Sequence, residues 1–62
     1  MNLQLSENEA RALRELLVAH LGDLSAEIAA TDNPGFRREL RERRDLLLRV
    51  RTTLEAELQQ RA

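Results

Sequence analysis

The chain has 62 residues, of which 34% are charged and none is cysteine, and its formal net charge at pH 7 is −1. This length allows one domain, residues 1–62, and a domain this small is marginal by itself. Without cysteine, disulfides and thiolate metal sites are excluded, which leaves self-association as the expected support. The longest apolar runs, at 16–19 and 46–48, are too short to span a bilayer, and no signal peptide opens the chain, so we expect a cytoplasmic protein.

The first half of the chain predicts a short arm followed by a helix. Polar and apolar residues alternate over residues 1–5, which favours an extended arm. Ser6 and Glu9 then match a capping box, so a helix should begin at Ser6 and run to about Thr31. Its apolar residues recur at spacings of three and four, at Ala10, Leu13, Leu17, Leu21, Leu24 and Ile28, with Leu16 and His20 beside that line. Gly22 indicates either close approach of another helix or a tolerated surface glycine.

Residues 31–35, Thr-Asp-Asn-Pro-Gly, form the strongest break in the chain. Pro34 has no backbone N–H and is disfavoured inside a helix, but it suits the first turn of a new one. We therefore predict a turn at 32–35, with Thr31 closing the first helix. Asn33 or Asp32 is expected to cap the second helix.

The second helix is predicted to run from Pro34 to about Gln60. Its expected buried line alternates spacings of four and three, as in coiled coils, through Phe36, Leu40, Arg43, Leu47, Val50, Leu54 and Leu58. Four oppositely charged pairs at a spacing of four are expected to support the helix: Glu39–Arg43, Asp45–Arg49, Arg51–Glu55 and Glu57–Arg61.

The charges of the two halves favour an antiparallel pair. Residues 1–31 carry five acids and two arginines, whereas residues 32–62 carry six acids and eight arginines. With the turn near residue 33, facing positions should have numbers that sum to about 67. This register predicts contacts of Leu17 with Val50, Leu13 with Leu54, and His20 with Leu47, and it brings Arg43 and Arg44 near Asp23 and Glu27.

The apolar arc is wider than one hairpin can cover, because apolar residues flank the expected seam at Leu16, Val18, Leu46 and Leu48. The fold predicted here is therefore an all-α antiparallel two-helix hairpin that pairs with a second copy into a four-helix bundle. A higher assembly or a different protein in the same groove stays open. The expected self-association interface comprises Leu13, Leu16, Leu17, Leu21, Leu24, Leu46, Leu47, Val50 and Leu54.

Residues with catalytic or metal-binding chemistry are few. His20, Asp23 and Glu27 share one side of the first helix, but the Glu-x-x-His order of di-iron bundles is missing. The chain has no Cys, no Tyr and no Gly-rich phosphate loop. We therefore expect a non-enzyme without metal, cofactor or small-molecule substrate.

An arginine cluster in the second helix supports an alternative function, binding of RNA or DNA. The cluster comprises Arg37, Arg38, Arg41 and Arg44. The layout is similar to that of Rop-type plasmid copy-number regulators, which are dimeric helical hairpins that bind RNA. The near-zero net charge and the interrupting acids Glu39, Glu42 and Asp45 count against this alternative.

Three short motifs carry a further resemblance: Leu-Ser-x-x-Glu-Ala at 5–10, Glu-Ile-x-x-Thr-Asp at 27–32, and Phe-Arg at 36–37. With them the chain resembles a group of short uncharacterised bacterial helical-hairpin proteins. The resemblance implies the hairpin fold and no activity. The sequence thus predicts a small homo-oligomeric protein-interaction or assembly module, with nucleic-acid binding as the alternative.

Overall fold

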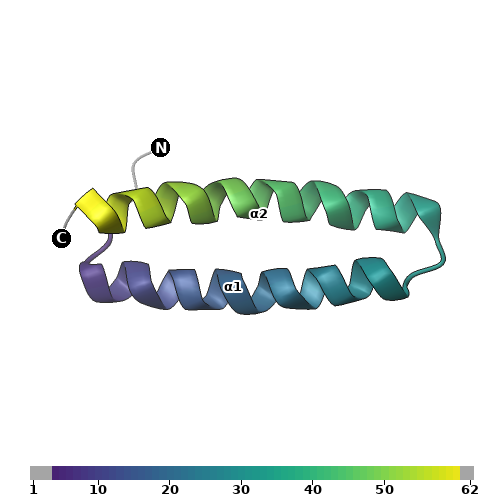
Figure 1. Ribbon diagram of the computed structural model, residues 1–62, viewed down its shortest axis with the longest axis horizontal. Coiled ribbons are helices and arrows are strands. Elements are labelled where there is room, and N and C mark those ends of the chain that lie inside the picture. The colour runs from purple at the N-terminus through teal and green to yellow at the C-terminus, as the bar shows by residue number, and fades with distance from the viewer. Residues whose placement is uncertain (1–3, 61–62) are drawn as a thin grey trace.

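The computed structural model describes residues 4–60 as two helices joined by a short turn. Helix α1 spans Glu7–Ala30 and helix α2 spans Pro34–Gln60. The helices run antiparallel and side by side along a long axis of 43 Å (Figure 1). The predicted all-helical hairpin is confirmed, and the predicted helix ends lie within one residue of those observed.

The start of α1 is set by Ser6 and Glu9, as the capping box predicts. The Ser6 hydroxyl accepts a hydrogen bond from the Glu9 backbone N–H at 3.1 Å, and the Ser6 backbone N–H donates to the Glu9 carboxylate at 2.8 Å. Two N–H groups that the first helical turn leaves without a partner are thereby satisfied. The backbone N–H of Ser6 in particular lowers the pKa of Glu9.

The turn between the helices is built from Thr31 and Asn33. The Asn33 carboxamide oxygen accepts from the backbone N–H groups of Gly35 at 3.0 Å and Phe36 at 3.2 Å, so Asn33 caps α2. The Thr31 backbone N–H donates a hydrogen bond to the Glu27 carbonyl at the end of α1. The Thr31 hydroxyl accepts a hydrogen bond from the Asn33 backbone N–H. Of the two caps that the sequence left open, the structure shows Asn33 rather than Asp32.

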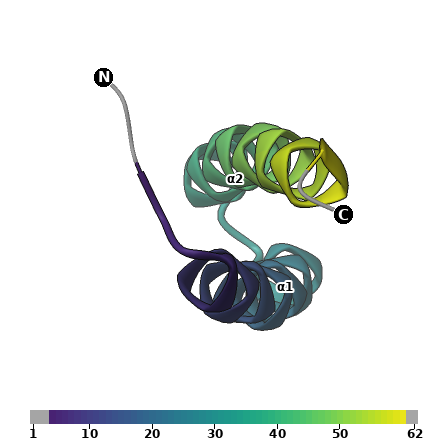
Figure 2. The same cartoon turned by 90° about the vertical axis from the view of Figure 1, so that its left-hand side faces the viewer.

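The N-terminal arm predicted for residues 1–5 lies partly outside the described residues, which begin at Gln4. Gln4–Ser6 are not helical, and they leave α1 along one side of the hairpin (Figure 2). Leu5 is half-buried and packs against the end of the core. Within its described part, the arm therefore adds the side chain of Leu5 to the apolar contacts of the helix pair.

The core is thin and entirely apolar. One cluster surrounds Leu17 and Leu54, and a second surrounds Leu24 and Leu40 nearer the turn. Leu47 packs against both clusters and joins them. Among the described residues, those that are buried are Ala10, Leu17, Leu21, Leu24, Ile28, Leu40 and Leu54.

The predicted buried line of α2 is wrong at three of its seven positions. Phe36 and Val50 are 45% and 46% exposed, and Arg43 is exposed as well. Their expected places are taken by residues one position later, Arg37, Arg44 and Arg51, each of which is half-buried.

The physical reason for this rotation of α2 is the apolar surface that it covers. The observed rotation half-buries Leu48 together with three long arginine stems, and such stems cover apolar surface while their charged ends reach water. The same rotation changes two of the three predicted contacts between the helices, while Leu13 packs against the cluster that contains Leu54, as expected. Leu17 shares its cluster with Leu54 rather than Val50, and His20 is exposed rather than packed on Leu47.

Gly22 does not mark a close approach of α2. A Cβ atom built on Gly22 has no atom within 4 Å. The sequence left two interpretations open, and within this chain the structure favours the second, a tolerated surface glycine.

Replacing Ser6 by alanine should lower the free energy of unfolding by about 1 kcal/mol, because the cap of α1 is lost. Urea unfolding followed by circular dichroism measures this change. Ser25→Ala is the matched control, since Ser25 is exposed within α1, away from its N-terminal cap, and alanine is the better helix former there. Equal losses for both variants would contradict the capping role.

The lowered pKa of Glu9 makes part of the stability depend on pH. Because the folded pKa lies below the unfolded one, this contribution is complete above the ordinary glutamate pKa of about 4.3 and is lost as the pH falls through the folded value. Glu9→Gln should therefore cost more stability at neutral pH than at acidic pH. A cost that is the same at both values, in urea unfolding, would show that the carboxylate charge is not involved.

Candidate interaction surface

The hairpin presents two broad faces, and helix periodicity assigns each side chain to one of them. Neighbouring residues of a helix differ by about 100° around its axis. A two-fold axis perpendicular to the plane of the hairpin exchanges two antiparallel helices. Side chains one position before a buried residue therefore share one broad face in both helices, and side chains one position after it share the opposite face.

The first of these faces collects most of the large apolar side chains that are exposed. Leu16 precedes buried Leu17 and is 65% exposed, and Leu46 precedes Leu47 and is 61% exposed. Phe36 and Val50 lie four residues before Leu40 and Leu54, which turns them toward the same side. We call this surface the apolar face; its residues are Leu13, Leu16, Phe36, Leu46 and Val50.

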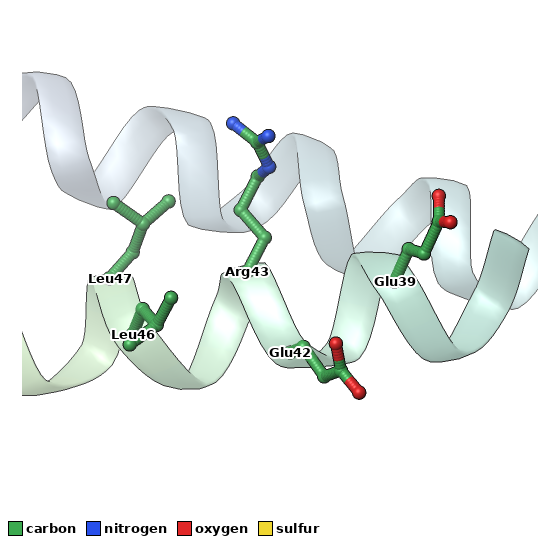
Figure 3. A pocket seen from close by; sticks show the side chains of 5 residues that line it. All are labelled: Glu39, Glu42, Arg43, Leu46 and Leu47. Atoms are coloured by element: carbon green, nitrogen blue, oxygen red, sulfur yellow. The ribbon is translucent and has the colours of Figure 1, made fainter.

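A shallow hollow lies on the apolar face along α2. It is lined by Leu46 and Leu47 with Glu39, Glu42 and Arg43 beside them (Figure 3). In this view Leu47 and Arg43 rise toward α1, while Glu42 points away from it. The hollow is open and formed by one helix, so it suits an inserted side chain of a partner better than an enclosed small molecule.

The structure divides the predicted self-association residues into two groups. Leu17, Leu21, Leu24 and Leu54 are buried between α1 and α2, so within one chain they form the hairpin core. Leu16, Leu46 and Val50 are exposed on the apolar face. Leu13 and Leu47 are half-buried at its edge. The sequence reasoning placed Phe36 in the hairpin seam and missed it as part of the exposed face.

The predicted arginine cluster does not form one uniform surface. Arg37 donates from Nε to the Ile28 carbonyl at 3.3 Å and from Nη2 to the Thr31 carbonyl, so it helps close the end of α1. Arg44 is half-buried, and Arg38 and Arg41 are exposed. Arg37 therefore has a structural task, which its spacing in the sequence did not indicate.

Three of the four predicted ion pairs of α2 are not formed, and the fourth is not tested by the described residues. Within residues 4–60 the salt bridge present is Arg11–Glu7 at 2.8 Å, in the first turns of α1. Glu39–Arg43, Asp45–Arg49 and Arg51–Glu55 remain apart, as do the expected cross-helix pairs of Arg43 and Arg44 with Asp23 and Glu27. The Glu57–Arg61 pair involves a residue outside the described range.

The residues considered for a metal site do not gather into one. In the part of the chain that the structure describes, no group of three or more His, Asp or Glu side chains is placed to hold an ion. Neither described helix contains an apolar stretch that could cross a membrane.

The chain matches no protein-family model, no curated protein and no solved structure.

Replacing Arg37 by methionine should lower the free energy of unfolding by about 1 kcal/mol, because two backbone carbonyls at the end of α1 lose a donor. Methionine keeps most of the aliphatic stem in place. Arg38→Met is the matched control, because Arg38 is exposed and makes no side-chain hydrogen bond among the described residues. If urea unfolding gives the same stability for both variants, the bonds of Arg37 contribute nothing.

Proposed function

We propose that this chain is a non-enzymatic assembly module that pairs with a second copy of itself through the apolar face. The observation that carries the proposal is the gathering of Leu16, Phe36, Leu46 and Val50 on one broad face. Exposed apolar patches of this kind mark interaction sites in soluble proteins. The thin core supports the same conclusion, because pairing buries the surface that one hairpin leaves open.

A second copy fits this face in size. The long and intermediate dimensions of the molecule are 43 and 21 Å, enough for the roughly 800 Å² per partner that stable interfaces bury. Face-to-face packing gives a four-helix bundle in which Leu46 and Leu16 lie near the centre. Buried apolar side chains near the centre of an interface contribute most of the binding energy.

The charges favour one orientation of the two copies. A two-fold axis parallel to the helices packs α1 of each copy against α2 of the other. This orientation places the acidic half of one chain against the basic half of the other. On the apolar face, this orientation brings Asp23 and Glu27 of one copy toward Arg43 of the other. Arg43 has no ion-pair partner within the described part of its own chain.

Sedimentation equilibrium of the natural chain over a wide concentration range should give twice the chain mass of 7.1 kDa. Leu16→Asp should weaken the dimer at least about tenfold, because a charge then enters the centre of the interface. Val18→Asp is the matched control: Val18 is 50% exposed on the same helix but follows Leu17, so it lies on the opposite face.

A natural chain that stays monomeric at every concentration would refute self-association. Equal weakening by Leu16→Asp and Val18→Asp would move the interface away from the apolar face. Both variants change side chains that are at least half exposed within the chain, so the hairpin itself should remain folded, as circular dichroism can check.

A further inference from the structure

The face opposite the apolar face is lined by arginines from both helices. Arg11 and Arg41 follow buried Ala10 and Leu40 by one position. Arg14 lies three residues before Leu17, which turns it about 60° toward the same side. Arg37, Arg44 and Arg51 stand in the same relation to Leu40, Leu47 and Leu54. We call this surface the arginine face; its residues are Arg11, Arg14, Arg37, Arg41, Arg44 and Arg51.

Most of these arginines lack a charge partner within the described part of the chain. Arg11 pairs with Glu7, and Arg37 donates to carbonyls of α1. Arg14, Arg41, Arg44 and Arg51 make no ion pair or side-chain hydrogen bond among residues 4–60. The Nε atoms of Arg44 and Arg51 are buried without a partner. The face therefore carries several positive charges that the chain itself does not neutralise.

The carboxylates on this side are too few to balance the arginines. Four carboxylates lie on the side of the arginine face, against its six arginines: Glu7, Glu15, Asp45 and Glu55. By contrast, Glu9, Asp23, Glu27 and Glu39 precede buried residues by one position and lie on the side of the apolar face. The net charge of −1 thus hides a separation of charge between the two faces. Local charge rather than net charge decides which ions a surface attracts.

The arginine stems are held in place by the fold. Arg14, Arg37, Arg44 and Arg51 are half-buried because their aliphatic stems lie along the seam between the helices. A side chain that is already ordered loses less entropy when its guanidinium binds a ligand. Guanidinium groups bind phosphate with paired, directed hydrogen bonds.

The spacing of the arginines fits a long ligand with repeated negative charges. Arg37, Arg44 and Arg51 recur every seven residues, which is about 10.5 Å along a helix, and the face continues across α1 to Arg14 and Arg11. The sole aromatic residue of the chain, Phe36, lies on the other face and offers no platform for stacked bases. A ligand on the arginine face is thus contacted through its backbone rather than its bases.

We propose that the arginine face binds the phosphodiester backbone of nucleic acid without reading its sequence. This site differs from the sequence-predicted cluster, because it includes Arg11, Arg14 and Arg51 and leaves out Arg38. The inference is independent of self-association. In the dimer proposed above the two arginine faces point outward on opposite sides and remain free.

Fluorescence anisotropy with a labelled RNA duplex and a DNA duplex of the same length tests the proposal on the full chain. Both should bind at about 50 mM salt and release at about 200 mM. Arg44→Gln with Arg51→Gln should reduce the slope of log affinity against log salt by about two, one for each lost phosphate contact. The matched control is Arg38→Gln with Arg49→Gln, which removes the same charge from two exposed residues outside both faces and should reduce the slope less.

A second double variant and a competitor complete the experiment. If the Arg44 and Arg51 double variant unfolds, Arg11→Gln with Arg41→Gln changes two exposed residues of the same face instead. Polyglutamate is added as a competitor and should displace the duplex poorly. The proposal is overturned if neither duplex binds at about 50 mM salt, if the control pair loses as much as the test pair, or if polyglutamate displaces RNA as well as unlabelled RNA does.

Discussion

The alternation of leucine and arginine along one line of α2 is the constraint on which the rest of the structure depends. Leu40, Leu47 and Leu54 recur every seven residues and supply the apolar contacts with α1, while Arg37, Arg44 and Arg51 recur between them. An arginine cannot be enclosed as a leucine can, because its charge must stay hydrated or paired. The helix pair therefore closes over the arginine stems and leaves their ends toward one broad face.

This arrangement gives the two faces of the hairpin different chemistry. Seating Arg44 and Arg51 in the seam rotates Val50 and Phe36 out of it, onto the side that already holds Leu16 and Leu46. One face then needs covering by another apolar surface, and the other carries charges with too few carboxylates beside them. Both proposals arise from this one rotation of α2, yet they concern opposite sides of the molecule and do not exclude each other.

Local sequence predicts the ends of the helices better than it predicts which residues lie between them. Ser6 with Glu9, and Asn33 with Pro34, act within four residues along the chain, so the capping box and the turn were predictable from those residues alone. The residues expected at a self-association interface separate into two groups in the structure. Leu16, Leu46 and Val50 are exposed on a common face, whereas Leu17, Leu21, Leu24 and Leu54 are buried within the hairpin.

The sequence by itself determined the two helices, the place of the turn and the antiparallel pairing, because these follow from apolar spacing, capping and proline chemistry. Only the tertiary structure decided which side of α2 faces α1. The sequence pattern accommodates Phe36, Arg43 and Val50 as readily as Arg37, Arg44 and Arg51, since both sets lie beside the same leucines. The choice rests on packing between the helices, where Leu48 and the arginine stems cover α1 and Arg37 reaches the carbonyls of Ile28 and Thr31.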